Sequence, residues 1–416
     1  MPATGGRSRR ALRLNRHQRG HLRVLIINTD YPAFLRQLYG AKPEMATASF
    51  EAQTVQRNAS FFGVFDAYSK GFEANGHEAW EVHANNGLIQ RQWAVEAGLR
   101  PRSQWKLPKR VEFLLRRVAH RLLPLPFDTS HVLRSPFDIA PWQLPDMLIA
   151  QAKRYRPDVI LNQSVSEVGS DLLERMRPYT KLIVGQIASP LPDDEDYRAY
   201  DLMISSLPNF VEHYRRLGVD ATLNRLGFDK RVLDAVRVPE RDVDVSFVGS
   251  LSPAHPARAQ LIEWLAGQTD LHIWGNGLDQ FPTQSPVHRH YHGEVWGTDM
   301  FRALGRSKIT VNNHIGIAEN YANNMRLYEA TGMGALLLTD RKSNITDMFE
   351  PGREIVCYES PEECLEMIRY YRANEAERER IAAAGQRRTL EEHSYLHRTA
   401  ELAELFAGKL AAHQKP

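Results

Sequence analysis

The sequence has very few cysteines and no long apolar segment. Cys357 and Cys364 are the only two cysteines in 416 residues, and they form neither a disulfide framework nor a metal-binding pattern. No run approaches the ~20 apolar residues that span a bilayer. The arginine-rich amino terminus also lacks the apolar segment of a secretory signal. We therefore predict a cytoplasmic protein, because a reducing compartment suits such a chain.

A large excess of charge is also missing. The formal net charge is only +3, which by itself gives no indication of nucleic-acid binding. Arginines crowd residues 1–20, where apolar residues are scarce, and we interpret this segment as a disordered basic tail. The dinucleotide fingerprint GxGxxG is absent, which argues against a nicotinamide-dependent dehydrogenase.

The remaining composition is that of a soluble globular protein. Hydrophobic residues make up 43% and aromatic residues 9% of the chain, both ordinary values. A chain of 416 residues exceeds one typical core, so two domains are expected. Apolar runs predict strands at His21–Asn28, Glu78–Val82, Asp158–Asn162, Lys181–Gln186, Asp201–Ser205, Val243–Val248, Leu271–Trp274 and Glu354–Tyr358.

The stretch Lys308–Asp340 is the most informative part of the sequence. It reads as an apolar strand, a polar loop, a short helix and a second apolar strand from Ala335 to Leu338. The short crossover predicts that the two strands are parallel. The loop from Asn313 to Asn323 then leaves the carboxyl end of a parallel strand, which is where open α/β sheets bind ligands.

The helix in this stretch has the features of an anion site. Asn324 is a suitable N-cap and Gly332 a suitable C-cap. The first-turn N–H groups of Met325, Arg326 and Leu327 would then point outward, and the helix dipole would favour an anion there.

Arg326 and Glu329 extend this interpretation. Arg326 can add a guanidinium group to a bound phosphate, and Glu329 offers two acceptors of the kind that hold vicinal hydroxyls. A diphosphate next to sugar hydroxyls describes a nucleotide-sugar. The alternative is an ordinary pair of residues three apart on a helix surface, which contributes only a few tenths of a kcal/mol.

The sequence resembles a known family of enzymes. The segment NNMRLYEATGMGALLLTD, preceded by KITVNNH and followed by FEPGREIVCY, is similar to the C-terminal domain of GT-B glycosyltransferases of the branch related to CgeB proteins. HLRVLIINTDYPAFLRQLYG, FGVFDAYSKGFEANGHE, DLMISSLPNFVEHYRRLGV and VSFVGSLSP resemble the same branch. This resemblance implies retaining transfer of a hexosyl group from a nucleotide-sugar, without a metal cofactor.

The resemblance also implies roles for individual residues. Glu329 matches the glutamate that holds the donor ribose, and the backbone of Ala322, Asn323 and Asn324 matches amides near the diphosphate. Arg258 corresponds to a basic residue near the diphosphate. Many relatives carry a second glutamate, which touches the donor sugar, where this chain has Tyr321. Glu319 lies two residues earlier, so the identity of the sugar stays open.

Further donor-side candidates follow the strand Val243–Val248 and the histidine segment. Gly249, followed by Ser250, lets the backbone approach a ligand closely. Trp296, or its neighbour Val295, lies in a loop that resembles the family's base-binding loop. His288, His290 and His292 alternate like one face of a strand, but no acidic or cysteine partner stands at ligand spacing, so we expect no metal site.

The acceptor is expected on the first domain. Asp30 and Tyr31 follow the first strand and should face the cleft. Asp30 is a candidate general base if the reaction inverts, or else a turn residue before Pro32. Residues 101–127 form a basic amphipathic insertion that either contacts an anionic membrane on its cytoplasmic face or packs on the domain.

Together these observations predict an α/β protein of the GT-B class, with two Rossmann-like domains facing a cleft. The predicted divisions are a tail at 1–20, an acceptor-side domain at 21–238, a donor-side domain at 239–394 and a returning helix at 395–416. The predicted function is glycosyl transfer from a nucleotide-sugar to a sugar, protein or lipid-linked acceptor, with no nucleic-acid partner. The alternatives are a nucleotide-sugar epimerase or phosphorylase on the same fold, and a catalytically silent sugar-binding or assembly protein.

Overall fold

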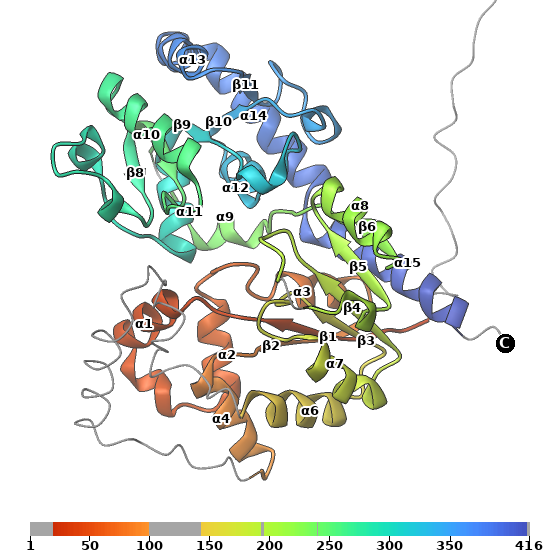
Figure 1. Cartoon of the computed structure of the whole chain (residues 1–416). Coiled ribbons are helices and arrows are strands. Elements are labelled where there is room, and N and C mark those ends of the chain that lie inside the picture. Colours follow the sequence, from red (N-terminus) through yellow and green to blue (C-terminus); the bar gives the residue numbers. More distant parts are fainter. Residues whose placement is uncertain (1–19, 100–142, 193–194, 239, 414–416) are drawn as a thin grey trace, which may run out of the picture.

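The structure is a computed structural model that describes residues 20–99, 143–192, 195–238 and 240–413. Two parallel sheets, each flanked by helices, lie in successive halves of the chain (Figure 1). This arrangement confirms the predicted α/β class with two sheets. The insertion 101–127 and nearly all of the tail 1–20 lie outside the described residues, so their predicted roles stay predictions.

The first sheet contains six parallel strands in the order β2-β1-β3-β4-β5-β6. All five strands predicted in this half are present within one or two residues of their predicted bounds. The strands are β1 Arg23–Asn28, β2 Glu78–His83, β3 Val159–Asn162, β4 Leu182–Gln186, β5 Leu202–Ser205 and β6 Ala221–Leu223.

Helices cover both faces of this sheet. Along β1, Val24 and Ile26 belong to one hydrophobic cluster, whereas Leu25 and Ile27 belong to another on the opposite face, as the period of two in a strand requires. The helices are α1 Pro32–Ala41, α2 Phe50–Asn58, α3 Ala67–Ala74, α4 Gly87–Glu96, α6 Leu144–Tyr155, α7 Ser170–Met176, α8 Pro208–Arg216 and α9 Arg231–Ala235.

The second sheet contains five parallel strands in the order β11-β10-β9-β7-β8. Its central β9–α12–β10 unit is the predicted strand–helix–strand stretch, and β9 and β10 pair in parallel. The strands are β7 Val243–Val248, β8 His272–Trp274, β9 Ser307–Asn312, β10 Leu336–Asp340 and β11 Val356–Tyr358. The helices are α10 Pro256–Gln268, α11 Gly297–Arg306, α12 Met325–Gly332, α13 Pro361–Ala373, α14 Glu375–Glu392 and α15 Tyr395–His413.

The last helix returns to the first half of the chain. α15 packs along α3, where the rings of Phe406 and Phe72 stack with centroids 6.1 Å apart. The Asn75 side chain donates to Thr399 Oγ1 at 3.1 Å. The polypeptide therefore crosses between the two sheets twice, once through α9 and once into α15 (Figure 1).

Three local predictions were wrong. The residue pattern of Phe50–Asn75 predicts one helix, but the structure has two, α2 and α3, because Phe61, Gly63 and Phe65 take positive φ angles between them. Gly332 ends α12 but is not its cap: the cap is Met333, and Gly334 adopts the left-handed conformation at φ +75°. A Cβ at Gly332 would lie 2.6 Å from the Phe228 ring, so close packing explains this glycine.

The third wrong prediction concerns the histidine strand. Residues Pro286–His290 form a 3₁₀ helix, so His288 and His290 do not alternate along a strand. His292 instead stacks on His272, with ring centroids 4.9 Å apart. Over the described ranges, no three or more His, Cys, Asp or Glu side chains are grouped to hold a metal ion. No helix in those ranges has the length and apolar character needed to cross a membrane.

Candidate functional site

Two adjoining cavities lie between the sheets at the carboxyl ends of their strands. The smaller, about 350 Å³, we call the arginine cavity, and the larger, about 760 Å³, the amide cavity. They share Thr29, Tyr31, Asn324 and Met325, so the two spaces meet at these residues. The arginine cavity is further lined by Phe62, Gly63, Phe247, Val248, Gly249, Arg258, Trp296, Gly297, Met300, Asn312, Arg326 and Glu329.

Hydrogen bonds of two asparagines, Asn324 and Asn312, hold the amino terminus of α12 in place. Asn324 Oδ1 accepts from the Leu327 N–H at 3.2 Å, which confirms Asn324 as the N-cap. Asn324 Nδ2 in turn donates to Asn312 Oδ1 at 3.0 Å, and Asn312 Nδ2 donates to Thr339 Oγ1 at 2.9 Å. This chain of bonds fixes the start of α12 to the ends of β9 and β10.

The cap leaves two backbone donors facing the cavity. The Leu327 N–H is used by Asn324, which corrects the expectation that it would stay available. The N–H groups of Met325 and Arg326 donate to no residue in the described part of the chain, and both residues line the arginine cavity. Together with the helix dipole they make this end of the cavity attractive to a phosphate.

Arg258 from α10 adds a fixed positive charge. Its guanidinium donates to the Asn313 carbonyl at 2.7 and 3.2 Å and to the Ser250 carbonyl at 3.1 Å. An arginine has five N–H groups, so the three bonds leave two for a ligand. Burial lowers the pKa of Arg258 to about 10, so it remains protonated at neutral pH. Backbone carbonyls therefore hold a cation at the wall of the cavity.

Arg326 and Glu329 form an ion pair inside the cavity. Arg326 Nη1 lies 2.9 Å from Glu329 Oε2, and only 14% and 6% of the two side chains are exposed. This corrects the alternative of a pair on a solvated helix surface, because both groups are buried against the cavity. Burial raises the pKa of Glu329 and lowers the pKa of Arg326, and the attraction between the two charges partly offsets both effects.

Two further predicted donor residues line the same space. Gly249 follows β7, and a Cβ there would lie 3.1 Å from the Phe247 ring. Trp296 precedes α11, and its ring meets Tyr31 and Phe62 edge-on, with centroids 5.7 and 5.4 Å away. The structure thus brings six predicted residues together around one cavity: Gly249, Arg258, Trp296, Asn324, Arg326 and Glu329.

Four other predicted residues do not line the arginine cavity. Glu319 is exposed and has a φ of 51°. Tyr321 packs against the hydrophobic cluster between the first sheet and α6–α8. The buried Ala322 has its N–H and carbonyl both bonded to the Asn344 side chain, so its amide is taken. The Ser250 carbonyl accepts from Arg258, and its hydroxyl accepts from the Ser252 N–H at 3.2 Å.

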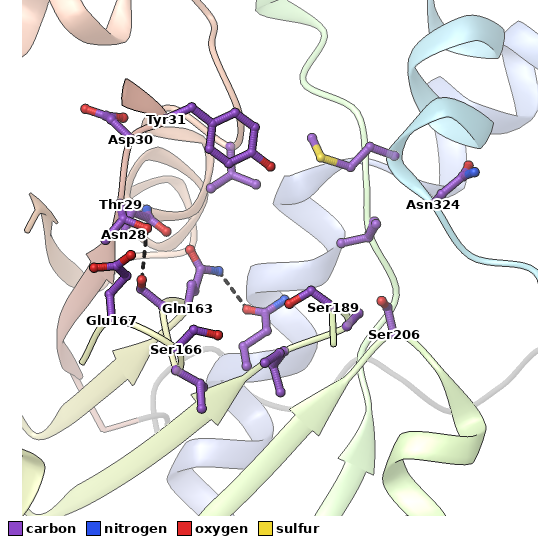
Figure 2. A pocket seen from close by; sticks show the side chains of 18 of the residues that line it. Asn28, Thr29, Asp30, Tyr31, Gln163, Ser166, Glu167, Ser189, Ser206 and Asn324 are labelled. Carbon is purple, nitrogen blue, oxygen red and sulfur yellow. Dashed lines mark hydrogen bonds between the residues drawn. The ribbon is translucent and has the colours of Figure 1, made fainter. Parts of the chain in front are cut away.

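Asn323 and Tyr31 belong to the amide cavity. Asn323 lines this cavity and not the arginine cavity, although the family resemblance implies a position near the diphosphate. Tyr31 lines both spaces, and 60% of it is exposed. Figure 2 shows its ring at the amide cavity.

Asp30 lies at the rim of the amide cavity, but its carboxylate is buried. Its side chain is fully covered and forms an ion pair with Arg57. Burial opposes ionisation, yet the charge and the hydrogen bonds of Arg57 outweigh it and hold the pKa of Asp30 below its ordinary value. Burial also lowers the pKa of His83 to about 3, which keeps this neighbour neutral. The structure therefore makes Asp30 the counterion of a buried arginine, not a group that faces the cleft.

Several polar residues of the amide cavity were missed in the sequence. Asn28 ends β1, Gln163 and Glu167 follow β3, and Ser206 follows β5 (Figure 2). The available signal was the position of polar side chains directly after buried parallel strands, the same signal that pointed to Asp30 and Tyr31 after β1. Glu167 is the exposed carboxylate of this cavity.

The two halves of the chain touch beside the arginine cavity. The Ser60 carbonyl accepts from the Thr298 N–H at 2.9 Å, which satisfies a donor at the start of α11. Gly297 permits this approach: its φ is +52°, and a Cβ would overlap the Ser60 carbonyl oxygen. The cavity is thus closed on one side by a contact between α11 and the segment after α2.

One part of the chain matches a known protein family. Residues 258–404 match the family model described as glycosyl transferase-like. The chain therefore carries a glycosyl transferase-like domain, which includes α10, α12 and their arginines. No curated protein matches the sequence.

Solved structures of low sequence identity share the architecture. Anabaena HepE, in complex with UDP-glucose, is 11% identical with a TM-score of 0.54, over 93% of this chain and 100% of that one. A glycosyltransferase from Rickettsia africae ESF-5 is also 11% identical with a TM-score of 0.54, over 94% and 99%. Sucrose-phosphate synthase from Thermosynechococcus elongatus is 11% identical with a TM-score of 0.52, over 94% and 100%. At this identity the similarity establishes the fold, which is GT-B, as predicted.

Proposed function

We propose that this protein is a glycosyltransferase that moves a sugar from a UDP-sugar or a related nucleotide-sugar to an acceptor in the adjoining cavity. One observation carries the proposal: Arg258, Arg326, the free N–H groups of α12 and Glu329 line a single space. A positive end for a diphosphate and a carboxylate for sugar hydroxyls match the two parts of such a donor.

The donor fits the arginine cavity in one orientation. Its diphosphate would lie against the amino terminus of α12 and Arg258, and its ribose hydroxyls would bond to Glu329. Arg326 would leave its ion pair for the phosphate, since its contact with Glu329 lacks hydrogen-bond geometry. The HepE structure with UDP-glucose supports a uridine nucleotide as the first choice. The likeness of the sequence to the CgeB-related branch supports the same chemistry.

We further propose that the reaction retains configuration. The carboxylate of Asp30, which the sequence offered as a base for an inverting reaction, is taken by Arg57. In retaining transfer the leaving diphosphate oxygen takes the acceptor proton. Arg258, Arg326 and the backbone N–H groups then stabilise the developing negative charge, an effect that typically contributes a few kcal/mol per donor. The amide cavity, against the first sheet, is the proposed acceptor side.

The test is nucleotide binding by thermal shift, with UDP, GDP, TDP and their sugars. A ligand at a hundred times its dissociation constant should stabilise the protein by about 2.7 kcal/mol. Glu329→Gln should lose this shift. Because the variant also leaves the buried Arg326 without its partner, its free form should melt at a lower temperature, and each shift is measured against the free form of the same variant. Glu174→Gln is the matched control, because Glu174 also pairs with an arginine three residues away, Arg177, but on the outer surface.

The outcomes separate the alternatives. Binding of one nucleotide that depends on Glu329, with sugar transferred to an added acceptor, supports the transferase. Conversion of the donor without any acceptor would identify an epimerase or phosphorylase. Nucleotide binding with no turnover would indicate a silent relative, and an unshifted melting temperature with every nucleotide would remove the donor site. The anomeric configuration of the product, read by NMR, decides between retention and inversion.

A further inference from the structure

Several buried polar atoms of the residues that line the amide cavity have no hydrogen-bond partner. Asn28 Nδ2, Gln163 Oε1, Ser206 Oγ and both polar side-chain atoms of Asn323 make no hydrogen bond within the described part of the chain. All four residues line this one cavity. Such atoms destabilise a fold unless they find a partner, and most buried polar groups do. Their concentration on one cavity wall points to a ligand that supplies the missing bonds.

These atoms are held in place by the surrounding strands. Asn28, Asn323 and Ser206 are only 7%, 7% and 3% exposed, so their side chains have little freedom to turn toward solvent. Gln163 is oriented by its other end, because its Nε2 donates to Gln186 Oε1 at 2.7 Å. Gln186 Nε2 in turn donates to the Tyr68 hydroxyl at 3.0 Å. This chain leaves the oxygen of Gln163 as the free acceptor (Figure 2).

The free atoms include both donors and acceptors. Asn28 and Asn323 offer N–H groups, Gln163 and Asn323 offer carbonyl oxygens, and the hydroxyl of Ser206 can do either. A hydroxyl group both donates and accepts, so a ligand rich in hydroxyls can satisfy all of them. A ligand that only accepts, such as a phosphate, cannot bond to the two carbonyl oxygens.

The charged side chains around the two cavities also favour a neutral ligand in the amide cavity. No lysine, arginine or histidine lines the amide cavity among the described residues, whereas Arg258 and Arg326 line the arginine cavity. The carboxylates on the amide side are Asp30, which is neutralised by Arg57, and the exposed Glu167. An anionic group would meet no cationic side chain among the described residues that line this cavity and would be repelled by Glu167.

An aromatic ring completes the site. Tyr31 lies where the two cavities meet and is 60% exposed. Phe62 and Trp296 contact it edge-on, at ring centroid distances of 5.4 and 5.7 Å. These contacts hold the ring while the rest of it stays accessible to an apolar C–H surface.

We infer that the acceptor is a neutral carbohydrate, bound in the amide cavity through its hydroxyls and resting on Tyr31. The role of this sugar as the acceptor rests on the proposed transferase function, whereas its binding in the amide cavity does not. The volume of about 760 Å³ is within the range of small-molecule sites. A phosphorylated or carboxylated acceptor is the chemistry that this cavity disfavours.

The first test compares sugars that differ in charge. Binding of methyl glucoside, maltose, glucuronic acid and glucose 6-phosphate is measured by calorimetry on the whole protein, with and without UDP. We expect saturable binding of a neutral sugar, with a dissociation constant at least tenfold lower than that of the acidic ones. Tighter binding of an acidic sugar, or no binding of either neutral one, would overturn the inference.

Two neighbouring serines provide a matched pair of variants. Ser206→Ala removes the unpartnered hydroxyl and should raise the dissociation constant for the neutral sugar roughly threefold to tenfold, the value of one hydrogen bond. Ser205→Ala removes a buried hydroxyl that accepts from the Leu207 N–H at 3.2 Å. It should lower the melting temperature and leave sugar binding unchanged. An unchanged sugar affinity in Ser206→Ala would place the sugar elsewhere.

The nucleotide titration separates this inference from the proposed function. UDP binding that depends on Glu329, combined with a preference for acidic sugars, would overturn the neutral acceptor and keep the transferase. Neutral-sugar binding that depends on Ser206, without any nucleotide binding, would keep the sugar site and overturn the transferase.

Discussion

Arg57 Nε donates to Asp30 Oδ1 at 3.1 Å, and at most 3% of either side chain is exposed. The guanidinium carbon also lies 5.5 and 5.8 Å from the ring centres of Phe34 and Phe62. The ion pair thus ties the end of β1 to α2 and to the segment that touches α11. The Arg57–Asp30 pair therefore stabilises the segments that line the cavities without facing the cavities itself.

Asp30→Asn should destabilise the protein without abolishing nucleotide binding. Removing one partner of a buried ion pair leaves an uncompensated charge, which typically costs about 3–5 kcal/mol. The measurement is urea unfolding of wild type and variant, together with the affinity for UDP. Asp196→Asn is the control, since Asp196 pairs with Arg198 on the open surface and its loss should leave stability unchanged. A stable Asp30→Asn protein without transferase activity would instead restore Asp30 as a base.

The same ion pair predicts a dependence of stability on pH. The pKa of Asp30 is held below its ordinary value of 3.8, because the charge and the hydrogen bonds of Arg57 outweigh the effect of burial. A carboxyl with a depressed pKa contributes stability above its unfolded pKa and loses it as the pH falls through the folded pKa. The stability difference between wild type and Asp30→Asn should therefore be full at neutral pH and shrink below pH 3.8. A difference that stays constant in acid would contradict the ionised state of Asp30.

The cap of α12 can be tested against another cap. Asn324→Ala should cost about 1 kcal/mol of stability, and it should also weaken nucleotide binding because the phosphate-facing turn loses its anchor to Asn312. Ser360→Ala removes the cap of α13, where Ser360 Oγ accepts from the Glu363 N–H at 3.1 Å. That variant should lose similar stability but keep its nucleotide affinity. Equal nucleotide affinities in both variants would show that the α12 terminus takes no part in binding.

The contact between the two halves can be tested at Gly297. Gly297→Ala should force α11 away from Ser60, increase the radius of gyration measured by X-ray scattering and weaken nucleotide binding. Gly293→Ala is the matched control: Gly293 also has a positive φ, +84°, but open space where a Cβ would stand. It should show only the backbone strain of about 1–2 kcal/mol. An unchanged scattering profile in Gly297→Ala would mean that this contact does not hold the cleft closed.

Much of the fold could be predicted from local patterns. The apolar run Val24–Ile27 that became most of β1 is buried on both faces, and such a strand is recognisable because successive residues are apolar. Asn324 was identifiable as a cap because capping involves residues only three apart. The break between α2 and α3 was missed, because its positive φ angles include Phe61 and Phe65, residues that do not mark left-handed backbone.

The lining of the arginine cavity was easier to predict than that of the amide cavity. Glu329, Arg326 and Asn324 lie within six residues of one another on one helix, so the sequence by itself placed them together. Tyr321 lies close to them in sequence, yet it packs toward the first sheet. The direction of a loop depends on what it packs against, which no local pattern records.

The sequence alone determined the class of fold, the strand–helix–strand unit and the capped amino terminus of α12, because each depends on periodicity or on neighbours a few residues apart. Only the tertiary structure decided that Asp30 is the counterion of Arg57, since the two residues are 27 positions apart and meet only where the folded chain buries both side chains. It also assembled the amide cavity from Asn28, Gln163 and Ser206, at the ends of three different strands. Parallel strands bring their carboxyl ends to one edge of the sheet, but which side chains stay unpartnered there is settled by packing.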